Sequence, residues 1–160
     1  MITTTTNPST GGHHLASPRA GGALTAWRSG DFLAVLRTVL KANAAFSLLG
    51  GVVAVAAGAV VADLLDVNVW LVRVIGAGLV IFAADVWWVA RRPANQITTY
   101  ARLVSAADAS WVVGTVVVIA LGLVSTAGAI VLAVVAAAVA DFGALQWYAS
   151  AKADRAALGG

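Results

Sequence analysis

Four long apolar runs constrain the fold of this 160-residue chain more than any other feature. They cover approximately residues 42–61, 69–90, 109–124 and 129–149, and most charged residues lie between or beyond them. A helix needs about 20 apolar residues to cross the hydrocarbon core of a bilayer. The chain is 61% hydrophobic and 11% charged, whereas globular domains are about half apolar and about a quarter charged. The sequence therefore predicts an all-α bundle of four transmembrane helices.

The rest of the chain divides into two tails around this membrane domain. We predict a disordered N-terminal tail over residues 1–29, a four-helix membrane domain over 30–150 and a C-terminal tail over 151–160. Residues 1–29 are rich in Thr, Gly, Ser and Pro and show no apolar period, which is typical of disorder. The adjacent His13 and His14 lie in this tail, where a specific metal site is not expected. The first apolar run begins too late for a secretory signal peptide, so we expect it to be retained.

Lys and Arg residues are distributed asymmetrically across the four predicted crossings. One side receives nine of them: Arg19, Arg28, Arg37, Lys41, Arg91, Arg92, Arg102, Lys152 and Arg155. Only Arg73 falls near the other side. Because cytoplasmic segments of membrane proteins carry the excess of Lys and Arg, both termini are predicted to be cytoplasmic, in a multi-pass protein of the cytoplasmic (inner) membrane.

An internal repeat is indicated by the first and third apolar runs. The segment 37–46 aligns with 102–111 at an offset of 65 residues, so that Asn43 meets Asp108 and Phe46 meets Trp111. In the second and fourth runs, Ala84-Asp85 echoes Ala140-Asp141. This pattern predicts two tandem helical hairpins related as a parallel pseudo-repeat, with an axis along the membrane normal. The alternative is a chance alignment between helices rich in Ala and Val.

Two acidic residues inside the apolar runs are the sharpest candidates for function. Asp85 and Asp141 lie roughly 8 Å and 12 Å below the interface, at a rise of about 1.5 Å per residue. Because a carboxylate facing lipid is costly, both are predicted to face the interior of the bundle. An Ala stripe at 129, 133 and 137 precedes Asp141 at four-residue steps and predicts a close-packing face. We group the candidate intramembrane polar site as Asp85, Asp141, Asn43, Ser47, Asp108, Lys41 and Arg37, with Ser110 and Gln146 in the same half.

Two interpretations of this polar site remain open. In the first, Asp85 and Asp141 form a proton or cation site in which desolvation and mutual repulsion perturb both carboxyl groups. In the second, the polar groups join helices to one another, with each Asp either protonated or paired to Lys41 or Arg37 and with Asn43 bonded across helices.

Near the opposite side of the membrane, Arg73 lies close in sequence to two acids of the first hairpin loop. The sequence predicts an outer rim in which Arg73 forms a salt bridge with Asp63 or Asp66, and an anion-entry site is the alternative. Along the first run, Gly50, Ala54 and Gly58 predict a small-residue face for close helix packing. The six Trp residues lie mostly at predicted helix ends, where they are expected to anchor the protein at the interface.

Several functional classes lack the residues that they require. The chain contains no Cys, and both His residues lie in the N-terminal tail, so no Ser-His-Asp set, haem ligand or His-based metal site is expected in the bundle. The cations are too dispersed for a nucleic-acid interface. A small four-helix multidrug exporter would need a Glu in its first helix, and this chain has no Glu. We therefore predict no enzymatic activity, no catalytic residue and no cofactor.

The overall pattern resembles a group of small four-helix bacterial inner-membrane proteins. The residues that carry the resemblance are Leu36-Arg37, Lys41-Ala-Asn43-Ala and Ser47-Leu-Leu-Gly50-Gly51 in the first helix, Ala90-Arg91-Arg92 after the second, and Ala-Leu-Gln146 in the fourth. The resemblance covers most of residues 31–150. It implies location and topology, because the group has no established activity to carry over.

These observations favour a non-enzymatic accessory or scaffold subunit that packs against itself or a larger membrane complex. The alternative is a small proton- or cation-coupled transporter that uses Asp85 and Asp141. A membrane enzyme with a lipid substrate is a third and weaker possibility. The expected partners are the lipid bilayer and either further copies of the chain or a larger complex, and no nucleic acid.

Overall fold

The computed structural model describes residues 23–158, which form six helices and no strand. The helices are α1 (Ala23–Ser29), α2 (Phe32–Ala56), α3 (Gly58–Leu65), α4 (Val69–Val89), α5 (Ala94–Ala120) and α6 (Thr126–Leu158). The described helices α2, α4, α5 and α6 are long and apolar enough to cross a membrane. The prediction of an all-α chain with four candidate membrane spans is confirmed, and it indicates a multi-pass integral membrane protein.

Local sequence signals account for several helix boundaries. The Asp31 side chain accepts a hydrogen bond of 3.0 Å from the backbone N–H of Ala34, and this cap begins α2. The Asn68 side chain caps α4 in the same way, accepting from the N–H of Trp70 at 2.8 Å. Pro93 precedes α5, where a residue without a backbone N–H is tolerated.

Helical structure extends further toward both termini than the sequence predicted. Residues 23–29 form α1 rather than part of a disordered tail, and α6 continues to Leu158 through most of the predicted C-terminal tail. The ring of Trp27 in α1 stacks on the ring of Tyr148 in α6 at a centroid distance of 5.5 Å. These packing partners stabilise a short helix that has no apolar period of its own. The prediction for residues 1–22, including His13 and His14, lies outside the described residues.

The first predicted crossing is divided into two helices. It was expected to run to residue 61, but α2 ends at Ala56 and α3 begins at Gly58. A Cβ atom on Gly58 would lie 2.9 Å from Cγ of Arg73, so the missing side chain leaves room for the Arg73 stem. Glycine also lowers helix stability by about 1 kcal/mol relative to alanine, which favours a break at this position.

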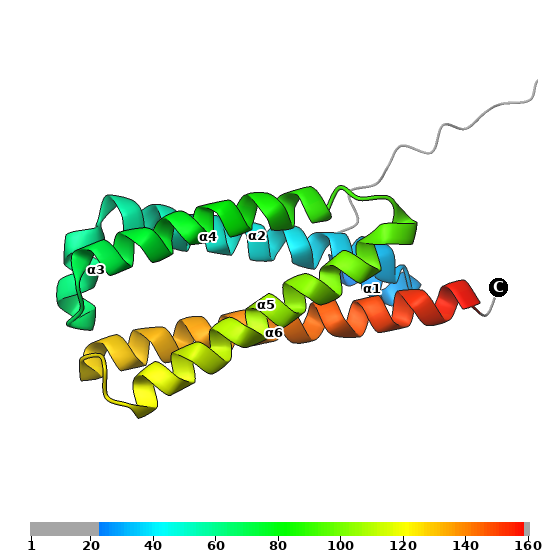
Figure 1. The fold of residues 1–160 in the computed structure, drawn as a ribbon. Coiled ribbons are helices and arrows are strands. Elements are labelled where there is room, and N and C mark those ends of the chain that lie inside the picture. The colour runs from blue at the N-terminus through cyan, green and yellow to red at the C-terminus, as the bar shows by residue number, and fades with distance from the viewer. Residues whose placement is uncertain (1–22, 159–160) are drawn as a thin grey trace, which may run out of the picture.

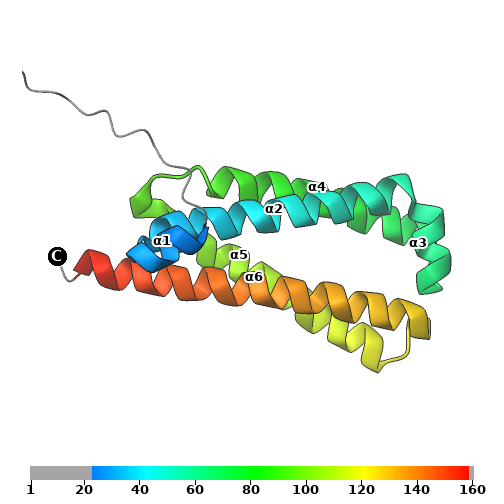
Figure 2. The same ribbon diagram turned by 180° about the vertical axis from the view of Figure 1, so that it is seen from behind.

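The four long helices are arranged as two antiparallel hairpins, α2 with α4 and α5 with α6 (Figure 1). The hairpins contact each other mainly through α2 and α6, whereas α4 and α6 make no contact within the described part of the chain. Helix α1 and the end of α6 lie at one end of the molecule, which we call the α1 end (Figure 2). Helix α3 lies across the opposite end, the α3 end.

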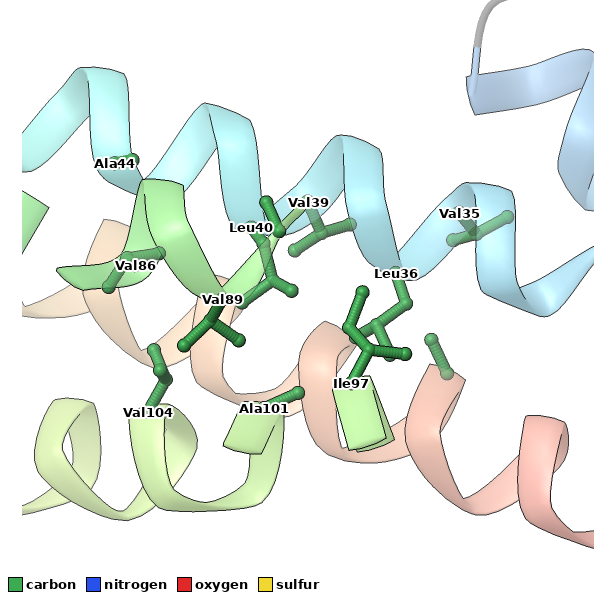
Figure 3. Packing of buried hydrophobic residues seen from close by; sticks show 12 residues of the cluster. Val35, Leu36, Val39, Leu40, Ala44, Val86, Val89, Ile97, Ala101 and Val104 are labelled. Carbon is green, nitrogen blue, oxygen red and sulfur yellow. The ribbon is translucent and has the colours of Figure 1, made fainter. Parts of the chain in front are cut away.

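Most of the buried apolar side chains gather at the α1 end. Figure 3 shows this cluster, in which α2, α4 and α5 meet over a short length. Its members are Val35, Leu36, Val39, Leu40, Ala44, Val86, Val89, Ala90, Ile97, Ala101, Val104 and Ala149. Ala149 brings α6 into the same cluster, so all four long helices share one core near this end.

A glycine contact holds α2 against α4 farther along the first hairpin. A Cβ atom on Gly51 would lie 2.7 Å from the carbonyl oxygen of Gly76, and one on Gly76 would lie 2.7 Å from Cβ of Ala54. Ala54 and Gly58 therefore belong to a close-packing face, as predicted. Gly50 does not, because it is exposed and a Cβ there would meet no atom within 4 Å.

Candidate functional site

Four buried polar side chains meet where the two hairpins come together. The amide Nδ2 of Asn43 donates a 2.8 Å hydrogen bond to Oδ2 of Asp108, and Nε2 of Gln146 donates to the same oxygen at 3.4 Å. The hydroxyl of Ser47 donates to Oδ1 of Asn43 at 3.4 Å. We call Asn43, Ser47, Asp108 and Gln146 the central polar cluster. Since its members come from α2, α5 and α6, it joins the two hairpins through side chains.

The positions of these residues on their helices explain how the cluster forms. Asn43 and Ser47 are one turn apart on α2 and share a face with the buried core residues of that helix. Asp108 lies opposite Gly143 of α6, where a Cβ atom would be 3.5 Å from Cβ of Asp108. The small residue on α6 therefore allows the carboxylate-bearing helix to approach closely, as is common at helix interfaces in membranes.

The sequence predicted three of the four cluster residues as site residues: Asn43, Ser47 and Asp108. It placed Gln146 only in the same half of the membrane. Gln146 is fully buried, and its Oε1 has no hydrogen-bond partner in the described part of the chain. Gln146 could have been identified from the sequence, because it is a polar amide side chain within an apolar run. Ser110, by contrast, is exposed and donates to the carbonyl of Ala106 on its own helix.

A cavity of about 530 Å³ lies between the hairpins, next to the central polar cluster. Its lining residues come from α2, α4, α5 and α6 and are mostly apolar: Phe46, Ser47, Leu49, Gly50, Val53, Ile75, Gly78, Leu79, Phe82, Ala107, Asp108, Trp111, Val135 and Val139. Among the described residues, Asp108 is the only charged one in this lining. We call this space the interhairpin cavity.

The two acids expected to face the interior point away from it, so that prediction is wrong. Asp85 and Asp141 are both exposed on the single chain. Their neighbours Val86 on α4 and Val139 on α6 occupy the buried faces instead. At about 100° per residue, Asp85 is rotated by about 100° from Val86 and Asp141 by about 200° from Val139, and both carboxylates lie on the exposed side of their helices.

The structure also does not bring the two acids together. Their helices, α4 and α6, do not contact each other within the described residues. The Ala stripe on α6 shares the outward orientation of Asp141, since residues 133 and 137 are exposed as well. The predicted close-packing face of α6 is therefore not used among residues 23–158.

Neither acid pairs with Lys41 or Arg37 within the described residues, so that option of the second interpretation is not observed. Lys41 is exposed, and Arg37 donates to the backbone carbonyls of Ala90 at 3.3 Å and Arg92 at 3.0 Å. Arg37 thus satisfies carbonyl groups of the C-cap of α4 and of the turn that follows it. The ion pair found within residues 23–158 joins Arg102 of α5 to Asp154 of α6.

At the α3 end, the predicted salt bridge of the outer rim does not form. Arg73 has no acidic partner within the described residues, and its guanidinium lies 5.5 Å from the centre of the Trp70 ring. Asp63 and Asp66 are both exposed. Asp66 ends α3 in a left-handed conformation with φ of 59°, so it serves as a cap residue. The Arg73 stem packs on Gly58 of α3.

The aromatic residues at the α1 end combine with cations. The guanidinium of Arg92 lies 3.3 Å from the centre of the Trp88 ring, and that of Arg91 lies 5.4 Å from Trp87. Lys152 lies 5.6 Å from the Tyr148 ring. Such pairs suit an interface where an aromatic ring is partly apolar and the cation remains hydrated.

No three His, Cys, Asp or Glu side chains within residues 23–158 lie close enough together to hold a metal ion. Comparison with other proteins adds no further assignment. No protein-family model, no curated protein and no solved structure matches this chain.

Proposed function

We propose that this protein is a non-enzymatic subunit of a membrane assembly, formed through the outward faces of α4 and α6. The observation that carries this proposal is the exposure of Asp85 and Asp141 within two apolar spans. Asp85 lies 16 residues after the start of α4, or roughly 24 Å along the helix axis, so it falls within a hydrocarbon core about 30 Å thick. Asp141 occupies a similar level on α6.

The free-energy cost of an exposed carboxylate in the membrane depends on which surface covers it. A charged side chain facing lipid costs about 3 kcal/mol at the bilayer centre and less toward the interface, so exposed carboxylates at these depths carry part of that cost. A second protein surface that supplies hydrogen-bond donors removes much of this cost. On α6, exposed Ala residues at 133 and 137 precede Asp141 at four-residue steps, so a neighbouring helix can approach the Asp141 face closely.

We further propose that the chain is a duplicated hairpin. Three observations support a parallel repeat. Asn43 and Asp108, aligned at an offset of 65 residues, are hydrogen-bonded to each other. At the same offset, the buried residues Leu36, Val39 and Leu40 of α2 correspond to the buried residues 101, 104 and 105 of α5. The equivalent arginines, at 37 and 102, each tie the first helix of a hairpin to the end of the second.

The orientation proposed for the chain places the α1 end in the cytoplasm of a bacterial cell. The termini of the described segment lie toward this end, where the cations concentrate. Arg73 packs on Gly58, the first residue of α3. This distribution supports the positive-inside arrangement. A membrane-impermeant maleimide applied to intact cells should label a Cys placed at Ala59 in α3 and leave one placed at Ala157 unlabelled.

The assembly is tested by disulfide cross-linking in native membranes. The natural chain has no Cys, so single-Cys variants give unambiguous products. If copies associate through α6, Ala137→Cys should give a band at twice the chain mass on oxidation, and Val113→Cys on the exposed face of α5 should not. Replacing Asp141 with Asn in the Ala137→Cys background should reduce that band. A chain that stays monomeric in membranes and binds no other subunit at either acidic face would contradict the proposal.

A further inference from the structure

The interhairpin cavity contains a buried carboxylate that no cation in the described chain neutralises. Asp108 is 3% exposed and lines the cavity. Its Oδ2 accepts from two neutral amides, those of Asn43 and Gln146, whereas no described residue donates a hydrogen bond to its Oδ1. The Arg102–Asp154 ion pair lies elsewhere on these helices. One carboxylate oxygen is therefore left to interact with whatever enters the cavity.

The remainder of the lining suits an apolar molecule that carries positive charge. Phe46, Phe82 and Trp111 contribute three aromatic side chains, whose ring faces attract cations. A carboxylate combined with aromatic rings is the usual chemistry for recognising alkylated ammonium or phosphonium groups. No Lys or Arg of the described segment lines the cavity, so this lining does not repel such a ligand.

The size and position of the cavity also fit a small hydrophobic ligand. Its volume of about 530 Å³ falls within the range of about 300–1,000 Å³ typical of small-molecule sites. Leu49, Ile75 and Gly78 line it and are exposed, so the cavity opens onto helix surfaces that face lipid in a membrane. A molecule dissolved in the bilayer can thus enter without crossing water.

We propose that the interhairpin cavity binds a hydrophobic organic cation, with the charged centre against Asp108 and the apolar body among the aromatic and aliphatic side chains. This inference is independent of the assembly proposed above, since Asp85 and Asp141 do not line the cavity. Two sources offer this chemistry: a free lipophilic cation and a membrane lipid with an ammonium headgroup.

The first experiment measures the contribution of charge. Binding of methyltriphenylphosphonium to the full-length chain in a mild non-ionic detergent is compared with binding of triphenylphosphine oxide, a neutral molecule of similar shape. The cation should bind at least about tenfold more tightly than the neutral molecule, since a charge-assisted contact exceeds 1.4 kcal/mol. Asp108→Asn should remove this preference. The matched control Asp63→Asn removes an exposed carboxylate in α3 and should leave both affinities unchanged.

The second experiment fills the cavity and leaves Asp108 in place. Gly50 and Gly78 line the cavity, and a Cβ on either would meet no atom within 4 Å. Gly50→Leu and Gly78→Leu should therefore fold normally and lose binding of both probes. Gly114→Leu is the matched control, because Gly114 has equal space around it and lies outside this cavity.

Competition identifies the natural class of ligand. Displacement of the phosphonium by phosphatidylethanolamine and not by phosphatidylglycerol assigns the site to a lipid headgroup, and displacement by neither assigns it to a free cation. The proposal is overturned if the phosphonium binds Asp108→Asn as tightly as the natural chain. It is also overturned if the neutral probe binds equally well, if Gly50→Leu retains binding, or if no binding occurs up to about 1 mM.

Discussion

The two ends of the bundle are held together in different ways. At the α1 end, large side chains such as Leu36, Leu40 and Ile97 from separate helices share one core, and all four long helices take part. At the α3 end, the contacts are between backbone and small residues: Gly51 against Gly76 within the first hairpin, and α3 against the start of α6. The interhairpin cavity extends from the central polar cluster toward the α3 end, and its lining reaches the residues next to Gly51 and Gly76.

This difference indicates that a shared hydrophobic core joins the hairpins at the α1 end, whereas contacts between α3 and the start of α6 join them at the α3 end. The central polar cluster lies at the boundary, where the shared core ends and the cavity begins. Lipid tails are as apolar as Leu, so helix association in a membrane depends on close packing and hydrogen bonds more than on apolar burial. Substitutions at the two ends should therefore lower stability through different interactions.

The largest effect is expected from Gly51→Leu in the first hairpin. A Cβ atom there would lie 2.7 Å from the Gly76 carbonyl oxygen and 3.0 Å from the backbone nitrogen of Val80, so α2 and α4 must separate. We expect a loss of more than about 3 kcal/mol in the free energy of unfolding, measured by SDS titration in mixed micelles. The neighbouring Gly50→Leu should change stability little. Equal losses for both variants would contradict the glycine contact.

Next in size is the effect of removing a large side chain from the shared core. Leu40 is fully buried, and Leu40→Ala should cost about 2 kcal/mol. This value is at the lower end of the range for soluble cores, because lipid supplies no hydrophobic driving force. Val60→Ala at the α3 end, where Val60 is 70% exposed, should have almost no effect in the same titration. A larger loss for Val60→Ala than for Leu40→Ala would show that the stabilising packing lies at the α3 end instead.

A smaller loss is expected in the central polar cluster. Asn43→Ala removes the 2.8 Å hydrogen bond to Asp108 and leaves that buried carboxylate with the longer contact from Gln146. The expected cost is about 1.5 kcal/mol, since an unpaired buried polar group loses its hydration without compensation. Asn95→Ala, at an exposed asparagine in the first turn of α5, is the control. In a double-mutant cycle, Asn43→Ala and Asp108→Ala should be strongly non-additive, whereas additive losses would show that the contact contributes nothing.

The smallest effect is expected for the hydrogen bonds that join α3 to the start of α6. The Ser125 hydroxyl donates to the carbonyl of Leu64 at 2.5 Å and accepts from the N–H of Gly128 at 3.0 Å. Ser125→Ala should cost about 1 kcal/mol, as expected for the loss of a helix cap. Hydrogen exchange should increase in α3 and the first turn of α6 but not at the α1 end. Unchanged exchange at the start of α6 would mean that the hydroxyl does not join these segments.

The sequence predicted the four membrane spans and part of the central polar cluster. Apolar runs identified the spans, and the alignment of Asn43 with Asp108 matched two residues that are hydrogen-bonded in the structure. The same reasoning could not orient Asp85 and Asp141, because the interior of the bundle is defined by which helices pack together. Arg37 illustrates this limit, since its partners are backbone carbonyls that no side-chain pattern reveals.

Length and hydropathy by themselves determined that this chain forms four helices able to cross a membrane, because these are properties of each segment taken alone. Only the tertiary structure decided which face of each helix is buried. The membrane helices are apolar on all sides, so hydrophobic periodicity gives little information about their orientation. Close contacts at small residues and hydrogen bonds between helices, such as Gly51 with Gly76 and Asn43 with Asp108, set that orientation instead.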